Sequence, residues 1–179
     1  GWSLLDELNA DPVNSRLELT EVAQPLLFAV QVGIVELLKD MGIHADAVTG
    51  HSVGEIAGAY VSGALTLDDA IRVIYFRSLA QGRTRGRGRM AAVRLAAGLM
   101  QPILDTYNGE IEIAAINASD SVTISGSKDA IRSIIEVLQE QAVSCRELDL
   151  DYAFHSKVMD DIEQYITANL SDLDPRPAK

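Results

Sequence analysis

The fold of this chain is decided by one stretch, Val48-Thr49-Gly50-His51-Ser52-Val53-Gly54. The run Ala45–Gly50 is short and largely apolar, which favours a buried strand, and the small apolar residues of Ile56–Val61 favour a helix. A serine between a strand and a helix, with glycine two positions away on each side, is typical of a nucleophile elbow. We expect the turn to leave no room for side chains at either glycine and to present the hydroxyl of Ser52.

The segments around the elbow predict an α/β fold with a parallel sheet, like the core of an α/β-hydrolase. Apolar residues recur at helical spacing from Gln24 to Met41, with Pro25 suited to the first turn. Another helix is expected from Thr66 to about Leu79, because its acidic start suits a helix N-terminus. The arginine-glycine run Arg83–Arg89 ends that helix.

Residues 90–150 have a different pattern and predict an inserted small subdomain. Their expected order is strand, helix, strand, strand, helix, strand, which matches the split βαβ, ferredoxin-like arrangement. We therefore expect a partial hydrolase-like core from residues 1–89 and 151–179, with the ferredoxin-like subdomain at 90–150 between its two parts.

Composition narrows the classes of partner and location. The chain has 179 residues, 47% hydrophobic and 23% charged, with a net charge of -11 that disfavours nucleic-acid binding. Its longest apolar run, Pro25–Leu38, is shorter than the roughly 20 residues that span a membrane. The lone Cys145 and the start of the sequence show no disulfide or signal-peptide pattern. We expect a cytoplasmic protein without a membrane partner, and no metal site, because the histidines and the cysteine lack ligand spacing.

A serine nucleophile needs a base, and the sequence offers three histidines. His44 lies in a polar turn, and His51 should point away from its neighbour Ser52. His155 is therefore the best candidate by elimination. The Val53 amide, at a helix N-terminus, could hold an oxyanion. Two alternatives stay open at this point, since the elbow motif also occurs as a plain tight turn and a lone histidine is often a core residue.

Further motifs along nearly the whole chain narrow the choice. In order, they are Gln24-Pro25, Gly50-His51-Ser52-Val53-Gly54-Glu55, Tyr75-Phe76-Arg77-Ser78, Gly88-Arg89-Met90-Ala91-Ala92-Val93, Asn117, Val122-Thr123-Ile124-Ser125-Gly126 and Tyr152-Ala153-Phe154-His155-Ser156. Together they make the chain similar to the malonyl-CoA:acyl carrier protein acyltransferase family, in the form found in modular type I polyketide synthases.

The resemblance implies a ping-pong acyl transfer by a Ser-His dyad, with Ser52 as nucleophile and His155 as acid and base. It implies that Arg77 pairs with the free carboxylate of a malonyl or methylmalonyl group. The alternative for Arg77 is a surface arginine paired with Asp68 or Glu55. Supporting roles in the pocket fall to Gln24 and Asn117, with the Val53 amide as an oxyanion donor.

The resemblance also implies the partners. These are malonyl-CoA or methylmalonyl-CoA, an acyl carrier protein with its phosphopantetheine, and neighbouring synthase domains, with no tightly bound cofactor. The segment Tyr152–His155 combines the tyrosine that accompanies methylmalonyl selection with the Phe154 that accompanies malonyl selection. We expect Phe154 to favour malonyl, although one methyl group changes the binding free energy by only about 1–3 kcal/mol.

The sequence departs from the family at both ends. It lacks the Gly-Gln-Gly strand that opens these domains and the strands that follow the histidine helix, so we expect an incomplete domain. A serine hydrolase such as an editing thioesterase, or a non-catalytic piece of a synthase scaffold, are the other readings. Arg77 argues against a hydrolase of apolar acyl chains. The arginines of Arg83–Arg89 form either a solvated loop or a contact with the carrier protein or the phosphates of coenzyme A.

Overall fold

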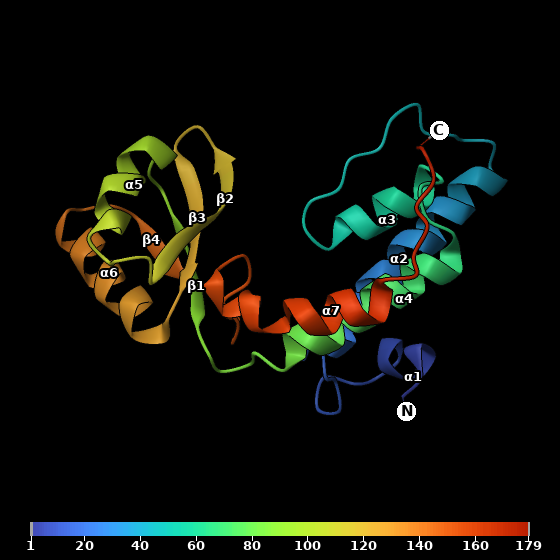
Figure 1. Ribbon diagram of the computed structural model, residues 1–179, viewed down its shortest axis with the longest axis horizontal. Coiled ribbons are helices and arrows are strands. Elements are labelled where there is room, and N and C mark those ends of the chain that lie inside the picture. The colour runs from blue at the N-terminus through green and yellow to red at the C-terminus, as the bar shows by residue number, and fades with distance from the viewer. Residues whose placement is uncertain (1, 179) are drawn as a thin grey trace. The chain divides into compact units, whose positions relative to one another are not determined.

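A computed structural model of the chain describes residues 2–178. The chain divides into two compact units, one formed by Gly1–Gly82 with Gln164–Lys179 and the other by Arg83–Glu163. Figure 1 shows the helices of the first unit and the sheet of the second. The second unit extends beyond 90–150 at both ends, because Arg85 and Arg87 form ion pairs with Asp151 and Asp161 inside it.

The first unit is helical in its described part. Its helices are α1 (Leu4–Leu8), α2 (Thr20–Asp40), α3 (Gly54–Val61), α4 (Leu67–Gly82) and α7 (Glu163–Leu170), the last of which starts at the final residue of the second unit. The helices α2 and α4 run alongside each other, and α3 packs on both (Figure 1). Phe28, Ile56 and Ile74, one from each of these helices, are buried together at the centre of the unit.

The helix α2 begins earlier than expected and is longer. It starts at Thr20, so Pro25 lies inside the helix and not in its first turn. At 21 residues with a mean hydropathy of 1.5, α2 is long and apolar enough to cross a membrane by length and composition alone. The sequence-based argument that the longest apolar segment is too short to span a membrane was therefore wrong. Val22, Leu26 and Phe28 on α2 are buried, whereas Leu27, Ile34 and Leu37 of the same helix are exposed.

The predicted strand Ala45–Gly50 and the parallel sheet around it are wrong for the described residues. The segment before Ser52 is irregular, and residues 2–82 and 164–178 contain no strand. A strand exists only through hydrogen bonds to a neighbouring strand, and no other segment of this unit is extended beside residues 45–50. The elbow forms in the structure without that sheet.

The second unit contains the elements β1 (Arg89–Val93), α5 (Ala97–Asp105), β2 (Ile111–Ala118), β3 (Ser121–Gly126), α6 (Lys128–Glu140), β4 (Cys145–Glu147) and the 3₁₀ helix η1 (Lys157–Ile162). The sheet order is β2-β3-β1-β4 and each neighbouring pair is antiparallel. This is the ferredoxin-like arrangement that the sequence predicts (Figure 1).

The core of the second unit lies between the sheet and its two helices. Val93, Val122 and Ile124 point from the sheet to this side and pack against Met100 of α5 and Leu138 of α6. The amphipathic pattern of α6 and the two-residue spacing of the buried pairs Ala91/Val93 and Val122/Ile124 account for this packing.

Candidate active site

The elbow holds Ser52 in a backbone conformation that side chains rarely adopt. Its φ of 52° lies in the left-handed region. The turn is closed by hydrogen bonds from the Gly54 amide to the His51 carbonyl and from the Glu55 amide to the Ser52 carbonyl, at 3.0 and 3.1 Å. Val53 is the N-cap residue of α3, so Ser52 lies at the start of that helix. Strain of this kind is typical of functional positions.

The two glycines of the elbow have different surroundings. A Cβ on Gly50 would lie 2.5 Å from the backbone nitrogen of Glu55, so no side chain fits there. A Cβ on Gly54 would have Gln31 Nε2 as its nearest neighbour, at 3.8 Å, which is an ordinary contact. The expectation of a tight fit is confirmed for Gly50 and is wrong for Gly54, because Gly54 is already the first residue of α3 and its Cα faces open space.

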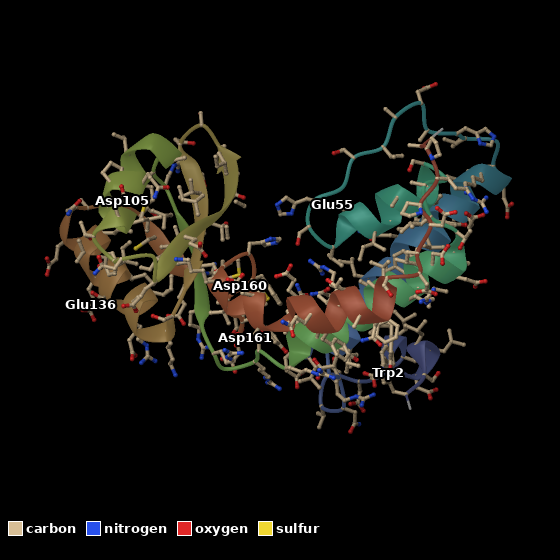
Figure 2. The ribbon with its side chains drawn as sticks, in the orientation of Figure 1. Trp2, Glu55, Asp105, Glu136, Asp160 and Asp161 are labelled. Carbon is tan, nitrogen blue, oxygen red and sulfur yellow. The ribbon has the colours of Figure 1, made fainter. Side chains whose placement is uncertain are left out.

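Arg77 contacts the hydroxyl of Ser52 directly. Its Nη2 donates to Ser52 Oγ over 3.2 Å, and its Nη1 donates to Gln24 Oε1. Partial burial lowers the pKa of Arg77, and the negative charge of Glu55 opposes that change. The alternative of a surface arginine paired with Asp68 or Glu55 is wrong, since Glu55, labelled in Figure 2, acts on Arg77 only by attraction through space.

The amide of Gln24 is held by two residues that the sequence analysis missed. Gln24 Nε2 donates to Thr20 Oγ1 at 2.6 Å and to Gln81 Oε1 at 2.8 Å. Both partners are buried, with exposed fractions of 5% and 7%. The signal in the sequence was spacing, because Thr20 and Gln81 stand four residues from Gln24 and Arg77 on the same helices and therefore share their faces.

His155 lies in the second unit, on a turn whose backbone is strained like that of the elbow. Its φ is 58° and its side chain is exposed. The turn is fixed by Ser156, whose Oγ donates to the Ala153 carbonyl at 2.7 Å and accepts from the Val158 amide at 3.4 Å. The Lys157 amide donates to Glu112 Oε2 on β2 at 2.7 Å, so a carboxylate caps the start of η1.

The two aromatic residues before His155 stack on each other. The rings of Tyr152 and Phe154 are 5.0 Å apart and nearly parallel, at 9°. Tyr152 is buried and Phe154 is half-buried, so the buried ring fixes the position of its neighbour. Asn117 is exposed on β2, and its Nδ2 donates to Thr123 Oγ1 on β3 at 2.9 Å.

The predicted site residues are divided between the two units. The first unit holds Ser52, Val53, Arg77 and Gln24, and it joins three of them into one hydrogen-bonded chain. The second unit holds Tyr152, Phe154 and His155 on one segment and Asn117 on a strand.

The arginine run is neither a free loop nor an open anion site. Arg85 pairs with Asp151 at 3.7 Å, and Arg87 pairs with Asp161, labelled in Figure 2, at 2.5 Å. Arg89 pairs with Asp151 and with Glu147. Three of the four arginines thus have acidic partners in their own unit, which weakens the predicted contact with a carrier protein or with phosphates.

A groove beside the elbow has a volume of about 730 Å³. It is lined mainly by apolar residues of α2 and α3 and by the segment that leads into the elbow. Neither Ser52 nor Arg77 lines it, so we do not assign it to the acyl group. Among residues 2–178, no three acidic, histidine or cysteine side chains gather in a way that could hold a metal ion.

The comparisons with known proteins decide the family. The family described as acyl transferase domain matches residues 1–179. The chain belongs to the acyl transferase domain family. It is 40% identical over 178 residues to polyketide synthase GfsB of Streptomyces halstedii and 38% identical over 178 residues to mycoketide-CoA synthase of Mycobacterium tuberculosis. Both alignments include 99% of this chain, but they include only 3% and 4% of the two synthases.

Solved acyl transferase domains have the same fold. The acyltransferase domain from module 8 of the salinomycin polyketide synthase superposes with a TM-score of 0.93 at 32% identity, over 99% of this chain and 42% of that one. A loading acyltransferase from the avermectin modular polyketide synthase superposes with a TM-score of 0.93 at 33% identity, over 100% of this chain and 57% of that one. The chain thus spans about half of these acyl transferase domains, and its resemblance to the acyltransferases of modular polyketide synthases is confirmed.

Proposed function

We propose that this chain transfers a malonyl-type group from coenzyme A to Ser52 and from there to the phosphopantetheine thiol of an acyl carrier protein. The observation that carries the proposal is the hydrogen bond from Arg77 to the hydroxyl of Ser52. A guanidinium this close to the nucleophile lies within reach of a carboxylate on a short acyl chain attached there. A related solved structure, with a TM-score of 0.86 at 27% identity, is a malonyl-CoA:ACP transacylase from Synechocystis.

In the first half-reaction Ser52 Oγ attacks the thioester carbonyl while His155 accepts the hydroxyl proton. The amide of Val53 donates to the oxyanion of the tetrahedral intermediate. The carbon–sulfur bond then breaks, the thiolate of coenzyme A takes the proton from His155, and an ester on Ser52 remains. The carrier thiol attacks that ester in the second half-reaction, with the proton transfers reversed, and Ser52 recovers its proton. This is a ping-pong transfer by a Ser-His dyad.

The free carboxylate of the acyl group binds to Arg77. A guanidinium presents parallel N–H donors that match the two oxygens of a carboxylate, and partial burial strengthens the pair. Malonyl carries its carboxylate two carbons from the ester oxygen, whereas acetyl has none. We therefore infer a preference for short diacids over monoacids.

The stacked ring of Phe154 favours malonyl over methylmalonyl. Because Tyr152 holds this ring, it cannot turn aside easily to admit a branched α-carbon. The cost of the extra methyl group is about 1–3 kcal/mol, which corresponds to a selectivity between about 10-fold and about 200-fold. The cytoplasmic location stays a prediction.

The test is transfer to a carrier protein. The protein carrying this sequence is mixed with malonyl-CoA and a phosphopantetheinylated carrier, and malonyl-carrier is measured by mass spectrometry for the wild type, Ser52→Ala and His155→Ala. Transfer by the wild type that both substitutions abolish supports the proposal. Release of free malonate at the same rate with or without carrier would point to a thioesterase and overturn it.

A further inference from the structure

Two buried residues with no part in the proposed chemistry accept hydrogen bonds from the Gln24 amide. Thr20 and Gln24 lie one turn apart on α2, and Arg77 and Gln81 lie one turn apart on α4. The four side chains meet between these helices. The bonds run from Arg77 Nη1 to Gln24 Oε1 and from Gln24 Nε2 to Thr20 Oγ1 and Gln81 Oε1.

A side-chain amide has one acceptor end and one donor end, so its orientation matters next to a cation. Arg77 can only donate, and it therefore requires the oxygen of Gln24. Gln81 presents its own oxygen to Gln24 and so requires the NH₂ group. If the Gln24 amide were turned over, donors would face each other at Arg77 and oxygens would face each other at Gln81. With the Gln81 oxygen in its present position, only one orientation of the Gln24 amide satisfies both neighbours.

We infer that Gln81 and Thr20 are positioning residues for Arg77, acting through Gln24. They keep the Gln24 oxygen aimed at Nη1, and this bond holds the guanidinium where Nη2 reaches Ser52. The inference rests on the proposed function, in which Arg77 binds the carboxylate of the acyl group. Thr20 and Gln81 act through Gln24 on the cation that binds the carboxylate, so we expect their loss to act mainly on diacid binding.

Gln81→Met and Thr20→Val test this, because each keeps the volume of the side chain and removes the acceptor. Gln81→Glu and Thr20→Ser keep an acceptor oxygen and serve as the conservative partners. Gln164→Met makes the same change at an exposed position of α7 and serves as the control. Acylation of Ser52 by malonyl-CoA and by acetyl-CoA is followed by intact-protein mass spectrometry in the protein carrying this sequence, and kcat/KM is obtained for each donor.

We expect Gln81→Met to lower kcat/KM for malonyl-CoA by about tenfold, because a buried donor of Gln24 is left unpaired. The value for acetyl-CoA should change by less than about twofold, since acetyl makes no use of Arg77. Thr20→Val should act in the same direction. Thr20→Ser and Gln164→Met should stay near the wild type, and Gln81→Glu should recover part of the loss, because it keeps the acceptor but buries a charge.

If Gln81→Met lowered kcat/KM equally for malonyl-CoA and acetyl-CoA at an unchanged melting temperature, Gln81 would act elsewhere. That result would overturn the inference. Unchanged malonylation in both Gln81→Met and Thr20→Val would also overturn it. If one variant melts early, the other still decides the matter. A wild type that malonyl-CoA does not acylate at all contradicts the proposed function itself, and the inference falls with it.

Discussion

Arg77 Nη2 donates to Ser52 Oγ over 3.2 Å, which joins a cation of α4 to the serine hydroxyl of the elbow. The same guanidinium donates to Gln24 of α2. Its position is thus set by two neighbouring helices and by the elbow, all within one compact unit. In the proposed transfer, a carboxylate on the acyl chain takes over this bond as the hydroxyl of Ser52 becomes an ester oxygen.

Replacement of Arg77 should change the choice of acyl group more than the rate of the chemistry. Arg77→Ala removes both guanidinium bonds to a carboxylate, so we expect kcat/KM for malonyl-CoA to fall about a hundredfold. Arg77→Lys keeps the charge without the planar fork and should lie between Arg77→Ala and the wild type. Acetyl-CoA is the comparison donor, measured in the same steady-state assay. A parallel fall for acetyl-CoA would show that Arg77 does not read the carboxylate.

The two elbow glycines should respond differently to alanine. Gly50→Ala places a Cβ 2.5 Å from the nitrogen of Glu55, so the elbow must open and Ser52 should lose its acylation. Gly54→Ala meets nothing closer than 3.8 Å and replaces glycine in a helix, so it should keep the melting temperature and most of the activity. Thermal melting and intact mass of the acylated chain check both. Equal damage in the two variants would contradict this account of the turn.

Glu112 should support catalysis by holding the turn that carries His155. Glu112→Ala removes the acceptor of the Lys157 amide, and we expect kcat/KM to fall about tenfold for malonyl-CoA and acetyl-CoA alike. Glu112→Gln keeps an oxygen and should recover most of that loss. Glu136→Ala, an exposed change on α6 labelled in Figure 2, is the control. A loss confined to malonyl-CoA would assign Glu112 to the substrate and not to the turn.

Cys145 should be a slow thiol. Burial raises the pKa of its thiol, and its Sγ lies 3.7 Å from the Ile135 carbonyl. At pH 8 the folded chain therefore contains less thiolate than the unfolded chain, and thiolate is the reactive form. We expect iodoacetamide to alkylate Cys145 more slowly in buffer than in urea, as measured by the mass increase over time. Equal rates at pH 8 would show that the thiol is open to solvent.

The sequence predicted those features that depend on neighbouring residues. The elbow at Ser52 follows from the spacing of glycines around a serine, and the structure has a turn there directly before α3. The order of strands and helices in the second unit follows from its turn residues and from the spacing of its apolar residues. The sheet has the predicted arrangement. Ser127 is an example of such a local feature. It is the N-cap residue of α6, and its side chain accepts a hydrogen bond from the amide of Ala130, three residues later.

The sequence did not predict features that depend on distant residues. Gln81 meets Gln24 across 57 positions, and Glu112 meets Lys157 across 45. The arginine run was judged by its charge alone, while its partners Asp151 and Asp161 lie far along the chain. Residues 45–50 have the composition of a strand, but a strand also needs a neighbour to pair with, and composition does not supply one.

The most direct test of the account is the mass of the intact protein after brief incubation with malonyl-CoA, with Ser52→Ala alongside. We predict a single added malonyl group on the wild type, located at Ser52 by fragmentation, a much slower addition from acetyl-CoA, and none on Ser52→Ala. Malonyl on Ser52→Ala, or acetyl and malonyl added at the same rate to the wild type, would contradict the assignment of Ser52 and Arg77 to a diacid acyl transfer.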